Sequence, residues 1–395
     1  MKLEPIIISL LDTDLYKFNM NQVIFHYHTN LVGEYVFKCR NEHVVFTPEM
    51  LEEINEQIDH LCRLRFKNDE LEYLRSIRFL KEDYIEFLRL WHPLRNYVST
   101  SLNEDGTLNI VVKGPLFSAM QFEIYLLSIV NEVYFRFKYD YDVLLESARR
   151  KLDEKLAKFE LKQYSLSFSE FGTRRRLSRE WQDEVIKKLV SSGVSKATSN
   201  VYFAKKYKIV PIGTFAHEFV QMYQGIPSIP LAYTNKAALK DWFKEYNGDN
   251  GIALTDTITT DLFLKDFDFL EASIYKGVRH DSGDPFAWGD KIIKHYQELG
   301  INPKEKQLLF SDSLDFDKAQ KLQDYFKDRC IVLFGIGTYV TNDTDVDPLN
   351  IVIKLQYVNG KPVAKLSDAL TKAMCQDDDY LTYLKNAVEW RLEHE

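Results

Sequence analysis

Cysteine is scarce in this chain of 395 residues, and its four copies are scattered. They form no C-x-x-C pair, so the sequence suggests neither a disulfide framework nor a zinc site and fits a reducing cytoplasm. Long apolar runs are also missing. The best membrane candidate, residues 115–135, is interrupted by glutamine, asparagine and two glutamates, and it predicts a core helix. The apolar run at 6–11 is too short for a signal peptide. We therefore expect a cytoplasmic protein without membrane contact.

Basic residues are in the minority. Lysine and arginine number 51 against 59 aspartates and glutamates, which gives a net charge of −8. General nucleic-acid-binding proteins carry a basic surface, so this balance argues against that class. It does not exclude a small anionic ligand, because a local arginine cluster can lie in an acidic protein. The length and a hydrophobic content of 45% predict a large core and more than one domain.

The chain has no low-complexity tract and no long Gly/Ser linker, so its organisation is inferred from periodicity. Residues 1–135 mix strand and helix patterns and predict an α+β N-terminal domain, which the 350–395 segment with its Asn359-Gly360 hairpin signal is expected to join. Between 136 and 349, seven short strand-like stretches each run into polar or glycine-rich residues and then into a helical pattern. The interval between the strand ends at Asn200 and Thr214 is shorter than the others, and the next interval is longer. This irregular spacing predicts an irregular α/β barrel of about seven strands.

Polar and glycine residues follow each of these predicted strands. An α/β barrel gathers the carboxyl ends of its strands at one face, where active sites form. The strand-end residues are Phe171, Gly172, Ser199, Asn200, Thr214, Asp256, Asp281, Asp312, Gly335 and Gly337. Taken singly, an Asp, Ser or Thr in such a place is better explained as a helix N-cap. As a set that includes arginines and two glycine loops, they favour a site for a phosphorylated, polyhydroxylated ligand.

Arginines and glycines supply the candidate anion-binding groups. Arg174–Arg176 directly follow Gly172-Thr173, and guanidinium forks bind phosphate in bidentate fashion. A solvated charge run is the alternative, but the helix dipole disfavours arginines at a helix start, which slightly favours a ligand. Arg279 and Asp281 are two residues apart and share a face of an extended strand, so that Arg279 could hold a phosphate while Asp281 accepts from a ribose hydroxyl. The FGIGT stretch at 334–338 offers backbone N–H groups to a monophosphate, or forms a plain tight turn.

Histidine gives no metal-site signal. No pair of histidines has metal-ligand spacing, so we expect no transition metal held by the protein. His280 and His295 are interpreted as surface or packing residues.

Eight collinear motifs between about residue 10 and residue 370 resemble the nicotinate phosphoribosyltransferase family. They are DTDLYKFNM (12–20), EIYLLSIVNE (123–132), EFGTRR (170–175), GTFAHEF (213–219), LTDT (254–257), VRHDSGDP (278–285), FSDSLD (310–315) and FGIGT (334–338). The resemblance implies that nicotinate and phosphoribosyl pyrophosphate give nicotinate mononucleotide and pyrophosphate, coupled to ATP hydrolysis, as an entry step to NAD. It also implies Mg²⁺ with the phosphorylated substrates and a homodimer.

The resemblance assigns roles to individual residues. His217 matches the histidine that ATP phosphorylates, and a neutral imidazole, near its ordinary pKa of about 6.5, is a competent nucleophile. Asp256 and Asp281 would serve the ribose and its surroundings, and Phe171 would stack on the pyridine ring. The other implied substrate contacts are Asp14, Tyr16, Arg174, Arg279, Asp312, Gly335, Gly337 and Thr338. Asp14 and Tyr16 would reach the pyridine pocket of a neighbouring subunit.

Ser199 bears on the choice of pyridine. It lies where nicotinamide-using relatives carry an aspartate, and its uncharged hydroxyl can donate to the carboxylate of nicotinate, so nicotinate is the expected substrate. Two positions depart from the family pattern: Ala197 replaces a usual glycine, and KLSDALTK lacks the usual Pro-Gly, which puts a ligand role for Lys372 in doubt.

Protein ligands for Mg²⁺ are not assigned, and three alternative functions stay open. The nearest is a nicotinamide phosphoribosyltransferase. A sugar-phosphate barrel lyase would need a metal cluster or a Schiff-base lysine, for which Lys276 is the near candidate. A non-catalytic regulator that keeps the nucleotide pocket is the third.

Overall fold

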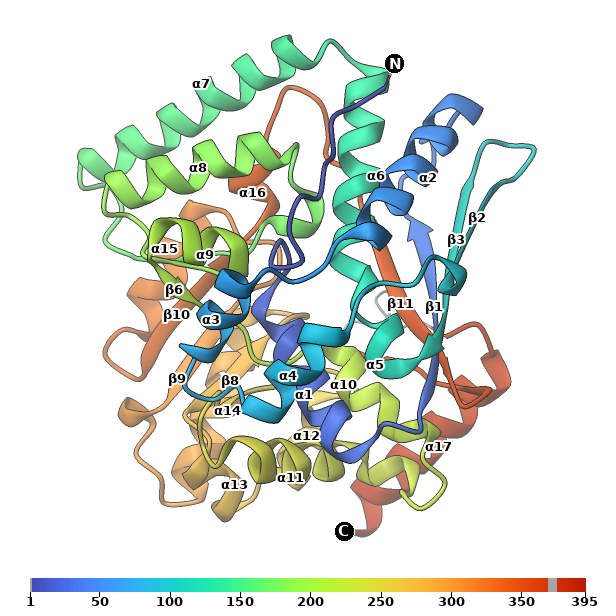
Figure 1. The fold of residues 1–395 in the computed structure, drawn as a ribbon. Coiled ribbons are helices and arrows are strands. Elements are labelled where there is room, and N and C mark those ends of the chain that lie inside the picture. Colours follow the sequence, from blue (N-terminus) through green and yellow to red (C-terminus); the bar gives the residue numbers. More distant parts are fainter. Residues whose placement is uncertain (1, 369–374) are drawn as a thin grey trace. The chain divides into compact units, whose positions relative to one another are not determined.

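The computed structural model describes residues 2–368 and 375–395 (Figure 1). The chain divides into two compact units. Unit 1 comprises Met1–Asn30, Glu34–Gly213 and Ile336–Lys354, and unit 2 comprises Leu31–Gly33, Thr214–Gly335 and Leu355–Glu395. The domain boundaries expected near residues 135 and 349 stay a prediction. Lys372 lies outside the described residues.

Unit 1 contains an antiparallel arrangement of strands at its N-terminal side. Strands β1 (Val32–Cys39), β2 (Val98–Leu102) and β3 (Leu108–Pro115) follow the order β1-β3-β2, and Thr100 pairs with Ile110. Helix α2 (Pro48–Arg63) begins where the hydroxyl of Thr47 accepts from the Met50 amide at 3.3 Å. The remaining helices of this region are α1 (Leu15–Tyr27), α3 (Asn68–Arg75), α4 (Glu82–Leu90) and α5 (Leu116–Ala119).

Helix α6 (Phe122–Lys138) forms the centre of unit 1. Every residue from Phe122 to Phe135 is buried, which confirms that this apolar stretch is a core helix. Its polar members find partners inside the unit: the amide of Asn131, for example, donates to the carbonyl of Arg176 at 2.7 Å. No helix among the described residues has the length and the apolar character that crossing a bilayer requires.

The second half of unit 1 carries three short parallel strands. These are β4 (Ser169–Glu170), β5 (Ala197–Thr198) and β6 (Val210–Pro211), in the order β6-β5-β4. Helices α7 (Tyr141–Glu160) and α8 (Arg179–Ser191) run side by side (Figure 1) and are joined by ion pairs such as Arg149–Glu184 at 2.8 Å. The amide oxygen of Asn200, directly after Ser199, caps the next helix, α9 (Val201–Tyr207), and helix α16 (Thr338–Thr341) completes the unit.

Unit 2 carries four parallel strands in the order β10-β9-β8-β7. They are β7 (Ile252–Leu254), β8 (Gly277–His280), β9 (Gln307–Phe310) and β10 (Ile331–Ile336), of which the last residue belongs to unit 1. Leu254 pairs with Arg279, and Phe310 pairs with both His280 and Phe334, so the carboxyl ends of these strands lie level. Among the described residues, unit 1 contributes three short parallel strands and unit 2 four, the number that the periodicity predicted.

Helices connect the parallel strands of unit 2. Helix α14 (Pro285–Glu298) is capped by the carboxylate of Asp284, which accepts from the Ala287 amide at 2.7 Å. The other helices are α10 (His217–Gln221), α11 (Thr234–Tyr246), α12 (Thr260–Asp266), α13 (Phe269–Ile274), α15 (Phe316–Phe326) and α17 (Asp378–His394). Strands β11 (Ile351–Val358) and β12 (Lys361–Pro362) form the predicted hairpin, whose Asn359 and Gly360 both have positive φ, as the tight turn requires.

Candidate functional site

The carboxyl ends of the unit 2 strands carry the predicted side chains. Asp256 lies two residues after β7, and Asp281 directly follows β8. Asp312 lies after β9, and Gly335 is the fifth residue of β10. Because the strands are parallel and in level register, these residues lie along one edge, as a strand-end site requires.

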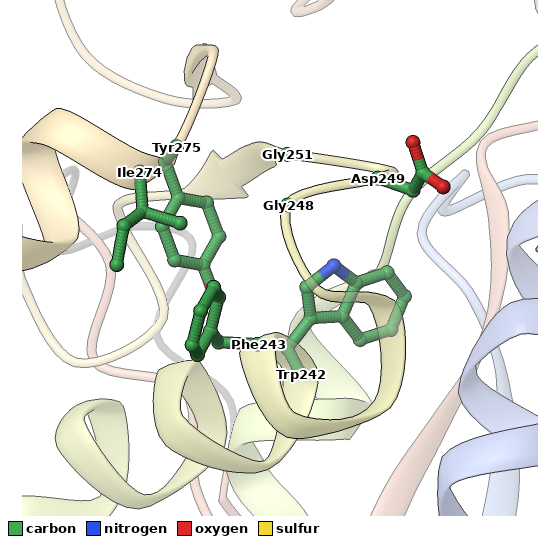
Figure 2. A pocket seen from close by; sticks show the side chains of 7 residues that line it. All are labelled: Trp242, Phe243, Gly248, Asp249, Gly251, Ile274 and Tyr275. Carbon is green, nitrogen blue, oxygen red and sulfur yellow. The ribbon is translucent and has the colours of Figure 1, made fainter.

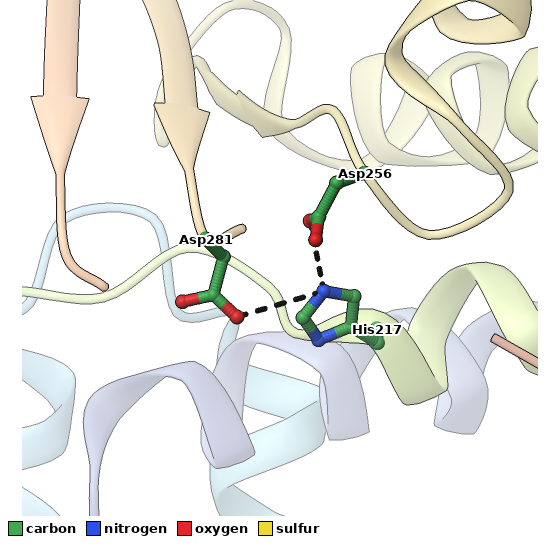
Figure 3. Close-up of side chains that lie close together, drawn as sticks. All are labelled: His217, Asp256 and Asp281. Carbon is green, nitrogen blue, oxygen red and sulfur yellow. Dashed lines mark hydrogen bonds and ion pairs between the residues drawn. The ribbon is translucent and has the colours of Figure 1, made fainter. Parts of the chain in front are cut away.

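His217 lies at the centre of this edge. It is the first residue of α10, and its ring points toward the carboxylates of Asp256 and Asp281 (Figure 3). The ring nitrogen Nε2 is 2.9 Å from Asp256 Oδ1 and 3.6 Å from Asp281 Oδ2. His217 and Asp256 are buried, whereas the side chain of Asp281 keeps 31% of its surface exposed. The structure therefore brings the three predicted catalytic residues together.

A lysine that the sequence did not indicate completes the cluster. Lys365 Nζ is 2.7 Å from Nε2 of His217 and 2.8 Å from Asp256 Oδ2. The hydroxyl of Ser282 donates to the same Asp256 oxygen at 2.5 Å, and Ser367 donates to Ser282 at 2.9 Å. Asp256 is thus fully engaged, with one oxygen facing the histidine and the other bound by Lys365 and Ser282.

The protonation of His217 follows from these neighbours. Burial and the ammonium of Lys365 lower the pKa of His217 to about 4, against the opposing pull of Asp256. Burial by itself would raise the pKa of Asp256, but His217 and Lys365 outweigh it and hold that pKa well below its usual range. At neutral pH the cluster therefore holds a neutral imidazole beside an ammonium–carboxylate pair.

Nε2 of His217 has one neighbour that accepts a hydrogen bond and one that donates. A neutral ring nitrogen either donates its N–H or accepts at its lone pair, but never both. Asp256 is an acceptor, and the Lys365 ammonium is a donor. Each tautomer of the neutral ring satisfies one of these neighbours, because Lys365 and Ser282 donate to Asp256 Oδ2 while Oδ1 faces Nε2. With the proton on Nδ1, the lone pair of Nε2 accepts from Lys365, and the nitrogen is a nucleophile that faces a cation.

Arg279 offers a second cationic group at this edge. It is the third residue of β8, and its guanidinium donates to the carbonyl of Phe215 at 3.2 Å. Its Nε is buried and has no hydrogen-bond partner among the residues that the structure describes. Burial raises the pKa of Asp281, but Arg279 holds it below its usual range. An orphaned guanidinium N–H beside a carboxylate suits a ligand with phosphate and hydroxyl groups.

A second group of predicted residues lies in unit 1. The hydroxyl of Ser199 donates to Asp14 Oδ1 at 2.8 Å, and the Leu15 amide donates to the Ser199 carbonyl at 2.8 Å. Burial raises the pKa of Asp14, although Ser199, Thr173 and Arg174 oppose the shift. The Ser199 hydroxyl is therefore engaged with Asp14 of its own chain.

The turn after β4 carries Phe171 and Arg174. The Phe171 amide donates to the carbonyl of Ile336 at 2.8 Å, and a Cβ on Gly337 would lie 2.7 Å from the Phe171 carbonyl oxygen. Only glycine permits this approach, so Gly337 is explained by packing as well as by a ligand. Thr338 begins helix α16, directly after Gly337.

A small hollow lies elsewhere in unit 2 (Figure 2). Its lining consists of Trp242, Phe243, Gly248, Asp249, Gly251, Ile274 and Tyr275. The indole N–H of Trp242 donates to the Asn250 carbonyl at 3.0 Å, and the Tyr275 hydroxyl donates to the Leu239 carbonyl at 2.8 Å. Because these polar groups serve the fold, the hollow does not match a phosphorylated ligand.

Comparison with known proteins decides the family. The model of the nicotinate phosphoribosyltransferase family matches residues 166–391, and that of the family's N-terminal domain matches residues 11–131. A nicotinate phosphoribosyltransferase of Chromobacterium violaceum is 49% identical over 96% of each chain, and one of Acinetobacter baylyi is 48% identical over 98% of each. The chain belongs to the nicotinate phosphoribosyltransferase family.

Solved structures agree with this assignment. A nicotinate phosphoribosyltransferase from Vibrio cholerae is 38% identical, with a TM-score of 0.90 over 97% of this chain and 94% of that one. One from Porphyromonas gingivalis is 34% identical, with a TM-score of 0.88 over 97% and 100%. The predicted family, enzyme class and fold class, an irregular α/β barrel with a mixed α+β N-terminal domain, are confirmed.

In this member of the nicotinate phosphoribosyltransferase family, Lys365 and Ser282 were missed by the sequence reasoning. Ser282 directly follows Asp281 in VRHDSGDP and could have been included with it. Lys365 opens the KLSDALTK stretch, but only Lys372 of that stretch was considered as a ligand, and no local pattern brings Lys365 to His217, 148 residues away. The interpretation of two other histidines as packing residues fits the structure. His280 is buried beside the rings of Trp288 and Phe310, and His295 contacts the Phe267 carbonyl at 2.7 Å.

Proposed function

We propose that the chain makes nicotinate mononucleotide and pyrophosphate from nicotinate and phosphoribosyl pyrophosphate, and that it couples this reaction to ATP hydrolysis through phosphorylation of His217. The observation that carries the coupling is a buried, neutral imidazole whose Nε2 faces the ammonium of Lys365. A histidine with a pKa of about 4 keeps its lone pair at neutral pH, and nucleophilic attack requires that lone pair.

The first step forms a bond between Nε2 of His217 and the γ-phosphorus of ATP and breaks the bond from that phosphorus to the bridging oxygen, which leaves with ADP. The Lys365 contact with Nε2 must open first. Once displaced, the ammonium is within reach of the transferred phosphoryl oxygens and can neutralise their charge. Water later breaks the N–P bond and releases inorganic phosphate, which restores the free imidazole.

In the transfer itself, the pyridine nitrogen forms a bond to the anomeric carbon, and the carbon–oxygen bond to pyrophosphate breaks. The transition state resembles an oxocarbenium ion, so a nearby carboxylate stabilises it. Asp281 is the best placed, because it is the partly exposed carboxylate of the cluster, and Arg279 beside it would bind phosphate. Phe171 and Arg174 of unit 1 are proposed to bind the ring and its carboxylate. Ser199 is proposed to join them once its hydroxyl turns from Asp14 to the substrate carboxylate.

Mg²⁺ fits one part of this cluster. Single ligand atoms of His217, Asp256 and Asp281 lie within 4.8 Å of one another, but Lys365 already places a cation against the first two. These residues do not suit a resident ion held by all three. They do suit an ion that arrives on the diphosphate and is held by Asp281, since Mg²⁺ binds through substrate phosphates and one or two carboxylates. When bound, it would neutralise the leaving pyrophosphate.

Labelling with γ-³²P-ATP tests the proposed coupling. Wild-type protein should form an acid-labile, alkali-stable phosphoprotein, and His217→Gln should not. His295→Gln is the matched control, because His295 contacts the backbone carbonyl of Phe267 and lies on helix α14, outside the cluster. Equal labelling of His217→Gln and wild type would show that another residue accepts the phosphoryl group.

We also propose a homodimer in the cytoplasm, with its domains divided near residue 135. The division agrees with the two family models, which match 11–131 and 166–391. The four cysteines are free, as a reducing compartment requires. For the dimer, Tyr16 is the residue proposed to reach the neighbouring site. Co-refolding inactive Tyr16→Ala with inactive His217→Ala should restore part of the activity, and a monomeric, fully active protein in sedimentation would contradict the dimer.

A further inference from the structure

Glu170 is a buried carboxylate that the proposed phosphoryl chemistry does not use. It is the last residue of β4, it directly precedes Phe171, and only 1% of its surface is exposed. Burial raises the pKa of Glu170 to about 7, although hydrogen bonds from Thr198 and Gly172 oppose the shift. An ionisable group kept in the interior at such a cost needs a structural reason.

The carboxylate of Glu170 binds three separate elements of unit 1. Oε1 accepts from the amide of Gly172, in the turn, at 2.5 Å. Oε2 accepts from the hydroxyl of Thr198, on β5, at 2.6 Å. The side-chain amide of Gln182, on α8, donates to both oxygens at 3.1 Å. One side chain therefore joins the turn, the neighbouring strand and a helix.

The backbone of Glu170 extends the same connection. Its carbonyl accepts from the amide of Ser199 at 2.9 Å, and Glu170 and Thr198 are register partners in the β4–β5 pair. Gly172 is held from its other side, because its carbonyl accepts from the Thr341 hydroxyl at 3.1 Å and a Cβ there would lie 2.1 Å from that hydroxyl. The turn that starts at Phe171 is thus fixed relative to Ser199.

We propose that Glu170 is a positioning residue for the pyridine substrate: its carboxylate holds the turn that carries Phe171 and Arg174 at a set distance from Ser199. The inference rests on the proposed function, in which those three residues bind nicotinate. A carboxylate suits this place because it offers acceptors only, and all three of its partners donate. An apolar side chain of similar size would leave those donors buried without acceptors.

The exchange of Glu170 and Gln182 gives a sharp test. In Glu170→Gln one carboxylate oxygen becomes an N–H₂ group, which meets either the Gly172 N–H or the Thr198 hydroxyl that now donates there, so one oxygen acceptor is left where there were two. In the double variant Glu170→Gln/Gln182→Glu a carboxylate again faces an amide, and the carboxylate now at position 182 can still accept from Arg176, as Gln182 Oε1 does at 3.0 Å. We expect the single variant to raise the KM for nicotinate about tenfold, with kcat and the KM for phosphoribosyl pyrophosphate within about twofold, and the double variant to recover most of that loss.

A matched control separates positioning from plain stability. Glu132 is likewise a buried carboxylate of unit 1. It accepts from the Arg179 amide at 3.1 Å and pairs with Arg136 at 2.7 Å, and neither partner belongs to the turn that carries Phe171 and Arg174. Glu132→Gln should lower the melting temperature as much as Glu170→Gln does, with an unchanged KM for nicotinate. Thr198→Val, which removes one donor, serves if Glu170→Gln does not fold, and it should raise the same KM by a few-fold.

The kinetic test distinguishes a failure of the positioning role from a failure of the proposed function. An inactive wild-type protein would overturn the function itself. An active wild type with a nicotinate KM that stays within twofold in Glu170→Gln, or a double variant that recovers nothing, would overturn the positioning role. Amide hydrogen exchange tests, without turnover, whether Glu170 holds the turn that carries Phe171. The Gly172 amide should exchange at least tenfold faster in Glu170→Gln. An unchanged exchange rate would overturn the inference.

Discussion

Replacing Lys365 with methionine should convert His217 from a permanently neutral group into one that titrates near neutral pH. In the wild type, a proton added to Nε2 meets the Lys365 ammonium at 2.7 Å. In the variant the same proton would meet only the carboxylates, with Asp256 Oδ1 at 2.9 Å. The pKa of His217 must therefore rise.

The size of the rise follows from the separation of the two charges. Two like unit charges 2.7 Å apart repel by roughly 6 kcal/mol at an effective dielectric constant of about 20, which corresponds to about four pKa units. Water that enters the space left by the ammonium reduces this effect, so we expect a rise of about two to four units. Starting from a pKa of about 4, the His217 imidazole of the variant should titrate between roughly pH 6 and pH 8.

Two measurements check this prediction. Carbon-13 labelling of the histidine Cε1 atoms gives the pKa by NMR, and His217→Gln assigns the signal. The initial rate of phosphoprotein formation should be independent of pH between about 5 and 9 in the wild type, whereas in Lys365→Met it should rise with pH, with its midpoint at the new pKa. Lys361→Met, which removes an exposed lysine of β12, is the control and should behave as the wild type. A His217 pKa that stays within about one unit of 4 in Lys365→Met would refute the reasoning.

Three further predictions concern stability and substrate recognition. Because the folded pKa of His217 lies below its ordinary 6.5, the unfolded chain binds the extra proton between pH 6.5 and 4, so stability falls as the pH is lowered through that window by up to about 3 kcal/mol. His217→Gln should lack this part of the loss in chemical denaturation at pH 7 and pH 4, and an identical pH dependence would contradict it. Arg279→Lys keeps the charge but loses the fork, and it should weaken binding of phosphoribosyl pyrophosphate by about 1–3 kcal/mol. An unchanged KM for that donor would argue against the phosphate contact. Ser199→Asp should lower kcat/KM for nicotinate by about 1–3 kcal/mol more than for nicotinamide. A variant that uses nicotinate normally would place the discrimination elsewhere.

The sequence predicted the strand ends well, because each parallel strand is bounded by local chemistry. Asp256 and Asp281 follow short apolar runs, and their places after β7 and β8 could be inferred from those runs alone. Boundaries that depend on packing cannot be inferred in this way. Helix α3 ends at Arg75, although apolar residues continue into a turn in which the Leu80 amide donates to the Ile77 carbonyl.

The parts of the site that could not be predicted depend on long-range contacts. Lys365 reaches His217 only because the chain returns through the β11–β12 hairpin, and no local pattern marks a lysine that will be buried. Likewise, the engagement of the Ser199 hydroxyl with Asp14 joins positions 185 residues apart. The sequence indicates which residues are chemically able to act, and the tertiary structure determines which of them meet.

The distance along the chain between His217 and Lys365 has a consequence for the protein during its synthesis. Ribosomes add about 5–20 residues per second, so the 148 residues that separate the two are made in roughly 7 to 30 s. During most of that interval His217 and Asp256 already exist, but Lys365 does not. A nascent chain that folds this far would hold a histidine with the raised pKa expected for Lys365→Met, so part of its imidazole would be protonated, and a protonated imidazole cannot attack ATP. The incomplete protein would therefore react with ATP more slowly than the finished chain.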